Sequence, residues 1–216
     1  MSFPAAVLLL LVASTAACAV ADPPDVEAAV LEVVLTGCQL NTSDRATATA
    51  VGDGLALTVA HAFDEASAVV VVAPNGAELS AELVYIDTER DIALLSFDNG
   101  TAEVATLEVR SDDDDPADEG RIVVRREDDT IVQPVELLRR TAVTLDGEGR
   151  REGIELGGVI ELGDSGAPLI DQDGGMIGMV FASSRSADTG WAVAGSELLD
   201  IASLAGSPIP LTCSLD

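Results

Sequence analysis

The chain lacks lysine altogether and has almost no histidine. Of its 216 residues, 11 are Lys or Arg, all of them Arg, 38 are Asp or Glu, and one is His. The formal net charge of −27 opposes binding to nucleic-acid phosphates and to anionic lipid surfaces, because like charges repel. We therefore expect no nucleic-acid partner. Any mechanism that needs an imidazole must use His61.

Aromatic residues are also scarce, at 3% of the chain, yet apolar residues make up 48% of it. That apolar share is enough to bury a core, so disorder is excluded for most of the chain despite its charge. The length allows one domain of ordinary size or two small ones. We therefore expect a folded, acidic protein whose solvated surface carries most of the charge.

The N-terminal region has an apolar run, Ala5–Ala17, that is too short for a comfortable membrane span of roughly 20 residues. Ala19-Val20-Ala21 follows it and matches the small-x-small pattern that signal peptidase reads. The pattern predicts a signal peptide over residues 1–21, export from the cytoplasm and no membrane span. The alternative is a lipid anchor at Cys18, because the residues before this cysteine resemble a lipoprotein cleavage box.

Only three cysteines are present, and cleavage after Ala21 would leave two of them, Cys38 and Cys213. An even pair of cysteines in an exported chain is most simply a disulfide. This disulfide would join the start of the folded region to its end. Two buried free thiols are the alternative.

Long amphipathic helices are missing, which argues against an α/β fold. From residue 26 onward, apolar runs of strand length, rich in β-branched side chains, alternate with turn clusters. This pattern predicts an antiparallel sandwich or barrel. Two stretches have helical features. In Asp25–Leu35 the aspartate could cap the first turn, and Ser196–Leu204 begins with a Ser cap and repeats apolar residues at three- and four-residue intervals.

The longest polar interruption is Ser111–Gly120, which includes a run of consecutive aspartates. We interpret residues 111–120 as a solvated connector between a first set of strands, at about 38–109, and a second set, at about 121–195. Residues 196–216 would form the C-terminal helix and tail. Calcium binding by the aspartates is the alternative, but a continuous run lacks the alternating spacing and the glycine of a dedicated calcium loop. No metal site is expected.

Three separated residues have side chains suited to nucleophilic chemistry. Ser165 lies in Gly163-Asp164-Ser165-Gly166, where small neighbours permit tight backbone geometry. His61 follows an apolar stretch, and Asp91 opens an apolar strand, an awkward place for an unpaired carboxylate. Taken singly, each has an ordinary explanation: a surface turn, a structural histidine and a strand-start residue bonded to backbone N–H groups.

Taken together, three motifs resemble those of the trypsin-like (chymotrypsin-fold) serine proteases. Thr58–His61 is similar to the histidine motif of that family, Asp91–Leu95 to its aspartate motif and Gly163–Leu169 to its nucleophile motif. The likeness extends from about Val26 to the end, and it is strongest to short exported bacterial members related to the HtrA protease domain. It implies an all-β domain at 22–216, made of two six-stranded antiparallel β-barrels and a short C-terminal helix, without a PDZ domain.

The resemblance also implies roles for individual residues. Ser165 would be the nucleophile, His61 its general base and later the general acid, and Asp91 the group that orients His61. The backbone N–H groups of Gly163 and Ser165 would form the oxyanion hole. No cofactor is expected.

One feature of the family is missing. The chain lacks the Ile/Val-Gly-Gly N-terminus whose amine, in zymogen-activated members, pairs with the aspartate before the serine. Asp164 therefore needs another partner, either an Arg or backbone donors, and activation by cleavage is not expected.

Substrate specificity is predicted from position within the motifs. In the family, the residue six before the serine lies at the base of the primary pocket, which corresponds to Val159 here. The pocket wall would come from Ala182, Ser183 and Ser184. An uncharged base predicts apolar or small residues before the scissile bond rather than Arg or Lys.

The sequence therefore predicts an exported serine endopeptidase, secreted or in the cell envelope, that acts as a monomer on protein or peptide substrates. A catalytically silent member of the same fold, serving as an envelope binding or scaffold protein, is the alternative. Covalent labelling of Ser165 would distinguish the two.

Overall fold

The computed structural model describes residues 25–38, 43–100, 102–111, 118–126, 129–145, 148–184 and 187–213. The signal peptide predicted over residues 1–21, with the alternative anchor site Cys18, lies outside these residues. The same holds for most of the predicted connector, since 112–117 are not among them. Within the described ranges, no helix has both the length and the apolar character needed to cross a membrane.

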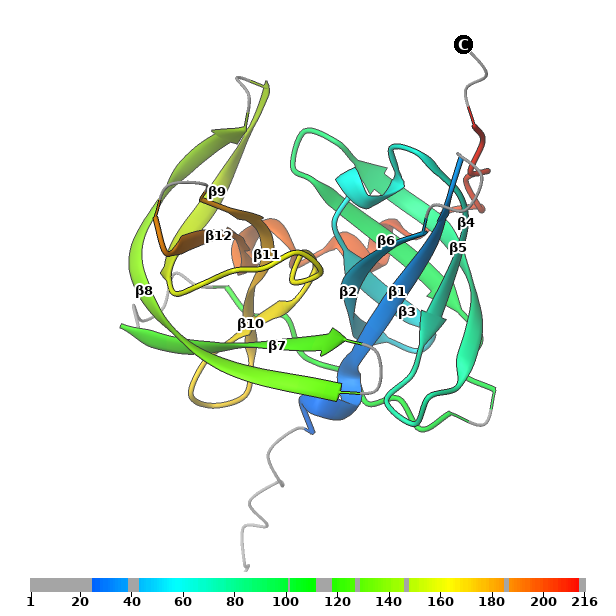
Figure 1. The fold of residues 1–216 in the computed structure, drawn as a ribbon, viewed down its shortest axis with the longest axis horizontal. Coiled ribbons are helices and arrows are strands. Elements are labelled where there is room, and N and C mark those ends of the chain that lie inside the picture. The colour runs from blue at the N-terminus through cyan, green and yellow to red at the C-terminus, as the bar shows by residue number, and fades with distance from the viewer. Residues whose placement is uncertain are drawn as a thin grey trace, which may run out of the picture.

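The described chain forms two closed antiparallel β-barrels of six strands each, which lie side by side (Figure 1). In order around the first barrel, the strands are β1 (Val30–Gly37), β2 (Ser43–Gly52), β3 (Leu55–Thr58), β6 (Ile92–Phe97), β5 (Glu78–Asp87) and β4 (Ala66–Val72). Around the second barrel they are β10 (Pro168–Ile170), β11 (Met176–Ser183), β12 (Thr189–Ala194), β9 (Glu148–Gly157), β8 (Asp129–Leu145) and β7 (Glu119–Arg126). The predicted all-β architecture of two six-stranded barrels is confirmed.

The prediction of a helix over Asp25–Leu35 is wrong. Asp25 does cap a turn, since Ala28 N donates to Asp25 Oδ1 at 3.2 Å, but the turn is only the short 3-10 segment η1 (Glu27–Ala29). From Val30 the chain is strand, because β1 pairs with β2 on one side and with β4 on the other. The first barrel thus begins at Val30, earlier than the predicted start near residue 38.

The C-terminal helix forms as two short 3-10 turns, η3 (Gly195–Glu197) and η4 (Ile201–Leu204). Leu198 and Ile201 are buried in an apolar cluster that contains side chains from both barrels. The chain then returns to the first barrel, where Ile209 N donates to Leu83 O at 2.7 Å (Figure 1). The C-terminal segment therefore ties the second barrel back to the first.

Strand β2 is buried on both of its faces, which identifies it as part of the junction between the barrels. Ala46, Ala48 and Ala50 pack into the core of the first barrel. Thr47 and Thr49, on the opposite face of the strand, are fully buried as well. A strand covered on one face by its own barrel and on the other by a neighbour needs small side chains on both.

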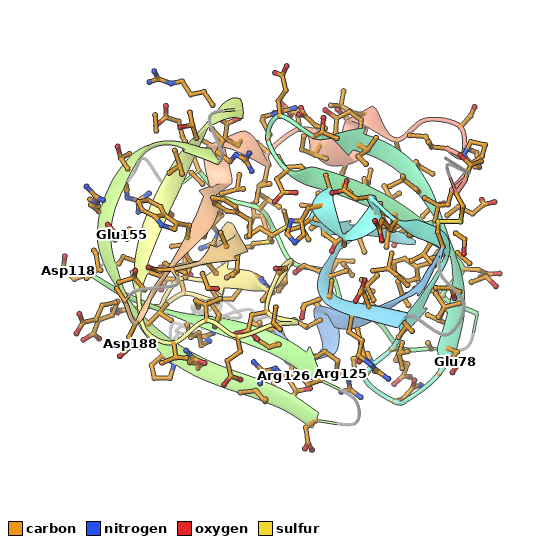
Figure 2. All side chains as sticks on the ribbon, turned by 45° about the horizontal axis from the view of Figure 1, so that its top comes forward. Glu78, Asp118, Arg125, Arg126, Glu155 and Asp188 are labelled. Carbon is orange, nitrogen blue, oxygen red and sulfur yellow. A yellow bond between two sulfur atoms is a disulfide. The ribbon has the colours of Figure 1, made fainter. Side chains whose placement is uncertain are left out.

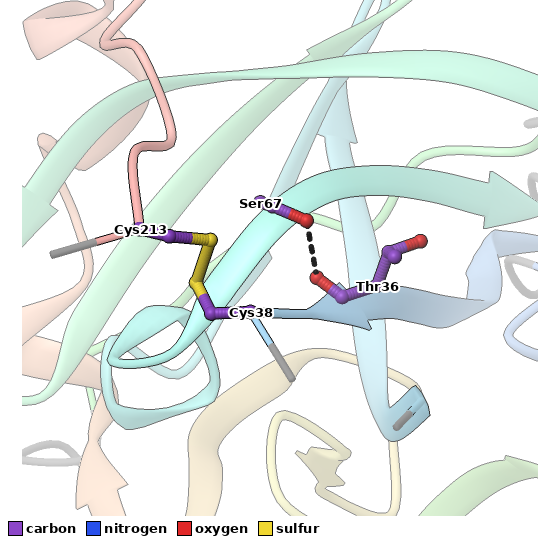
Figure 3. The surroundings of a disulfide bond; sticks show 4 residues. All are labelled: Thr36, Cys38, Ser67 and Cys213. Atoms are coloured by element: carbon purple, nitrogen blue, oxygen red, sulfur yellow. Dashed lines mark hydrogen bonds between the residues drawn. A yellow bond between two sulfur atoms is a disulfide. The ribbon is translucent and has the colours of Figure 1, made fainter. Parts of the chain in front are cut away.

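The predicted disulfide between Cys38 and Cys213 is present, with the two Cα atoms 5.4 Å apart. Figure 3 shows that it links the end of β1 to the C-terminal segment, beside the hydrogen bond that Ser67 Oγ donates to Thr36 O at 3.1 Å. Cys38 N also donates to Glu65 O at 2.8 Å. The bond thus joins two residues that are 175 positions apart, and the loop it closes contains every strand except β1.

Replacing both cysteines, in the variant Cys38→Ser/Cys213→Ser, is expected to lower the free energy of unfolding by about 2–5 kcal/mol, because the unfolded chain loses a long-range cross-link. Urea unfolding followed by circular dichroism measures the loss. A reducing agent should destabilise the natural chain and leave the double variant unchanged. Equal stability of the two proteins under oxidising conditions would contradict a structural role for the disulfide.

Candidate active site

His61 and Asp91 are brought together by the pairing of two strands of the first barrel. His61 begins the 3-10 turn η2 (His61–Phe63) just after β3, and Asp91 directly precedes β6. Since β3 and β6 run antiparallel, with Thr58 opposite Ala93, the end of one lies beside the start of the other. The Asp91 carboxylate accepts twice from the same residue, from His61 N through Oδ1 and from His61 Nδ1 through Oδ2, both at 2.8 Å.

Asp91 has an unusual backbone conformation for this contact. Its φ is +59°, and it is the one residue other than glycine with a positive φ among those the structure describes. Aspartate tolerates this left-handed region better than most side chains, yet the conformation costs free energy that the surroundings must offset. The side chain is 7% exposed, and the two bonds to His61 hold it there.

The contact with Asp91 also determines the protonation chemistry of His61. In the neutral imidazole, the hydrogen bond to the Asp91 carboxylate favours the tautomer that carries its proton on Nδ1 and leaves Nε2 as the acceptor nitrogen. The pKa of His61 is raised above 6.5, chiefly by the hydrogen bond to Asp91. Burial lowers this pKa, the charges of Asp91 and Asp64 raise it, and the charge of Arg151 lowers it.

Ser165 lies in a tight loop of the second barrel whose backbone conformation favours glycine at two positions. Gly163 and Gly166 have φ values of +94° and +89°. A Cβ on Gly166 would lie 1.8 Å from Thr47 O, so no larger residue fits. Around Gly163, by contrast, the space for a Cβ is open. His61, Gly163 and Ser165 line one open cleft.

Thr47, which the sequence did not single out, fastens this loop to the first barrel. Its N–H donates to Ser165 O at 2.8 Å, and its Oγ1 donates to Gly163 O at 2.9 Å. Thr58 Oγ1 in turn donates to Thr47 O at 2.8 Å. The only available signal was the alternation of Ala and Thr over residues 46–50, which indicates a strand with small side chains on both faces.

Asp164 has both kinds of partner that the sequence predicted for it. The side chain is fully buried, and Oδ1 forms an ion pair with Arg126 Nη2. Oδ2 accepts from Glu161 N at 2.8 Å. Arg126 stands next to Arg125 at the end of β7 (Figure 2) and also pairs with Glu161. The charge of the residue before Ser165 is therefore neutralised from within the chain.

The backbone N–H groups predicted to form the oxyanion hole are those of Gly163 and Ser165. Among the described residues, neither Gly163 N nor Ser165 N donates to another backbone group. Ser165 Oγ likewise has no hydrogen bond to His61 Nε2 within this part of the chain, although both residues line the same cleft. Hydrogen bonds between a nucleophile and its base are often absent from ligand-free sites and form when substrate binds.

The predicted pocket residues lie outside the lining of this cleft. Val159 is 53% exposed, and its carbonyl accepts from Gln133 Nε2 at 2.7 Å. Ala182, Ser183 and Ser184 belong to or directly follow β11. The role of all four in substrate binding stays a prediction.

Ile160, next to Val159, was not singled out by the sequence. It is buried, and a Cβ placed on Gly190 would lie 2.2 Å from its Cγ1. Because Gly190 pairs with Ser183, Ile160 occupies the space beside the predicted pocket wall.

Comparisons with known proteins show which family the chain belongs to. A family model described as the trypsin-like peptidase domain matches residues 46–179. Serine protease HTRA1A of Danio rerio is 32% identical over 139 residues, which cover 59% of this chain and 27% of that protein. Serine protease HTRA1 of Xenopus tropicalis is 30% identical over 139 residues, which cover 59% and 28%. The chain thus spans about a quarter of the length of these curated relatives.

Two solved structures show the same fold. The active form of the Rv3671c protease from M. tuberculosis matches with a TM-score of 0.76 and 20% identity, over 97% of this chain and 100% of that one. The HtrA-type protease AlgW, solved with a tripeptide, matches with a TM-score of 0.72 and 23% identity, over 82% and 60%. Because the family model covers more than half of the chain, the chain belongs to the trypsin-like peptidase domain family.

Replacing Arg126 with Gln is expected to lower the free energy of unfolding by about 3 kcal/mol, because the variant leaves the Asp164 carboxylate buried without a counter-ion. Chemical denaturation measures the change.

Arg139→Gln is the matched control, since Arg139 is 63% exposed and pairs with Glu155 on the surface, and it should cost less than about 1 kcal/mol. The double variant Arg126→Gln/Asp164→Asn should recover part of the loss. Equal effects of the two single variants would show that the buried pair has no special role.

Proposed function

We propose that this protein is an exported serine endopeptidase that cleaves peptide bonds through an acyl-enzyme, with both barrels supplied by one monomeric chain. One observation supports it most strongly. The His61–Asp91 pair of the first barrel and the Ser165 loop of the second open onto the same cleft. Serine, histidine and aspartate placed in this way perform acyl transfer in unrelated folds, so the chemistry depends on their geometry.

In the first half of the proposed reaction, Ser165 Oγ attacks the carbonyl carbon of the scissile peptide. Its proton passes to His61 Nε2, while Nδ1–H remains bonded to Asp91. The carbonyl oxygen becomes an oxyanion that accepts hydrogen bonds from Gly163 N and Ser165 N. Each such donor contributes about 2.7–4 kcal/mol to lowering the barrier.

Collapse of this intermediate breaks the bond between carbon and nitrogen. His61 then protonates the leaving amine, and the acyl group stays on Ser165 as an ester. In the second half, a water molecule attacks the carbonyl carbon of this ester while His61 takes its proton. The bond from this carbon to Ser165 Oγ then breaks, His61 returns the proton to Ser165 Oγ, and the acid product leaves. The proposed reaction needs no metal ion or organic cofactor. Within the described ranges, no group of three or more His, Cys, Asp or Glu side chains is placed to bind a metal.

The proposed substrate preference is for a small apolar residue before the scissile bond. Ile160 supports this preference, because its side chain fills the space over Gly190 beside the predicted wall formed by Ala182, Ser183 and Ser184. A shallow pocket accepts a short side chain and excludes an aromatic or a long basic one. Export and a location outside the cytoplasm rest on the predicted signal peptide.

A fluorophosphonate probe tests the proposed activity most directly. The natural chain is expected to gain the mass of one adduct on Ser165 without prior cleavage, and Ser165→Ala is expected to gain none, because the probe reacts only with an activated serine. Intact-protein mass spectrometry measures both.

A folded natural chain that stays unlabelled, before and after limited proteolysis, would contradict the proposal. It would favour the catalytically silent alternative, in which the fold serves binding or scaffolding.

Replacing Ile160 with Ala is expected to raise kcat/KM for peptides with Phe before the scissile bond, relative to peptides with Ala there, by about tenfold or more. The reason is that the variant opens the space over Gly190. Cleavage of matched peptide pairs measures this ratio.

Val159→Ala is the matched control, since this neighbouring residue is 53% exposed. A change of preference in Val159→Ala, with none in Ile160→Ala, would restore Val159 as the pocket base and overturn the role given to Ile160.

A further inference from the structure

A buried arginine of the second barrel lies against the His61–Asp91 pair of the first. Arg151, on β9, is 3% exposed, and its Nη1 is 3.7 Å from Asp91 Oδ2. The same oxygen accepts the Nδ1–H of His61. The hairpin that carries Arg151 packs directly on the loop before Asp91, because a Cβ on Gly149 would lie 2.1 Å from Glu89 O.

Arg151 has fewer polar contacts than a buried cation normally needs. Its Nε and Nη1 have no hydrogen-bond partner in the described part of the chain. The guanidinium stacks on Phe181, with Cζ 4.9 Å from the ring centroid. Burial lowers the pKa of Arg151, while the charges of Asp91, Asp87 and Glu197 raise it. A buried charge of this kind is strongly unfavourable without a counter-ion.

Of these three carboxylates, Asp87 and Glu197 already share another cation, Arg90. Arg90 Nε pairs with Asp87 at 2.7 Å, and Arg90 Nη1 lies 3.6 Å from Glu197. Asp91 forms no ion pair with an arginine other than Arg151 within the described residues. Asp91 is therefore the specific counter-ion of Arg151.

We propose that Arg151 is a positioning residue for the active site. Arg151 pairs with the buried Asp91 carboxylate, so the negative charge of Asp91 is shared between two partners, the arginine and His61. The roles of Asp91 and His61 in catalysis rest on the proposed function. The pairing itself rests on geometry alone.

The pairing has a defined effect on His61. The charges that shift the pKa of His61 are those of Asp91, Asp64 and Arg151, and of these only Arg151 opposes the protonated form. The other charged side chains that line the cleft with His61 are Asp44, Arg45 and Glu65. Removing Arg151 leaves the whole Asp91 charge to stabilise the imidazolium, so the pKa of His61 should rise. Because Ser165 needs a neutral imidazole, the acid limb of kcat/KM should move to higher pH. Arg151 thus keeps the proposed base available at lower pH.

The single histidine of the chain makes this effect directly measurable. In protein grown with labelled histidine, one imidazole signal reports His61, without assignment and without activity. The Ser165→Ala background prevents self-cleavage. In this background, Arg151→Met is expected to raise the pKa of His61 by on the order of half a unit or more, and Arg151→Lys, which keeps the charge, by less.

Arg125→Met is the matched control. Arg125 is also a buried arginine of the second barrel with an unpartnered Nε, but it donates to Thr130 Oγ1 and Pro74 O. Its removal should leave the pKa of His61 unchanged. If Arg151→Met does not fold, Arg151→Gln supplies a neutral side chain for the same comparison.

A pKa of His61 that stays constant or falls in the folded Arg151 variant would overturn the proposal, as would an equal rise in Arg125→Met. In the active chain, the acid limb of kcat/KM should shift by the same amount as the pKa. If the pKa of His61 shifts as expected but the natural chain cleaves no peptide, the Arg151–Asp91 pairing is supported and only the proposed protease function is contradicted.

Discussion

The two hydrogen bonds from Thr47 to the Ser165 loop are the contact on which the arrangement of the site depends. His61 and Asp91 belong wholly to the first barrel, whereas Ser165, Gly163 and their N–H groups belong to the second. Thr47 joins the two sets by its N–H and its hydroxyl, at 2.8 and 2.9 Å. Neither barrel alone contains all the residues of the proposed site. Their relative positions therefore depend on how the two barrels are held together at the junction.

Buried charge pairs also support the site. The chain has 38 acidic residues and 11 arginines, yet its deeply buried carboxylates near the site are paired with arginine. Arg126 neutralises Asp164 within the Ser165 loop, and Arg151 reaches from the second barrel to Asp91 in the first. Unpaired, either of these buried carboxylates would be strongly unfavourable. The remaining negative charge is free to lie on the solvated surface.

The sequence was most informative where one residue type or one local motif determines the outcome. The structure places His61 beside Asp91, gives the glycines beside Ser165 a positive φ and joins the two cysteines. The helix predicted from local features over residues 25–35 does not form. From Val30 the chain pairs with β2 and β4, and this pairing outweighs its helical propensity. The sequence could not predict the roles of four residues, because each acts through contacts with residues far away in the chain: Thr47, Arg126, Ile160 and Arg151. Thr47 and Gly163, for example, are 116 positions apart.

The central claim is that two barrels assemble one site for acyl transfer. A crystal structure of the natural chain with a peptide boronic acid tests it most directly, since the boronate imitates the tetrahedral intermediate. The account predicts a covalent bond from Ser165 Oγ to boron and one boronate oxygen within about 3 Å of both Gly163 N and Ser165 N. A second oxygen or Ser165 Oγ should lie within hydrogen-bond distance of His61 Nε2. A boronate that leaves Ser165 unmodified, or whose oxygens point away from both amides, would contradict the account.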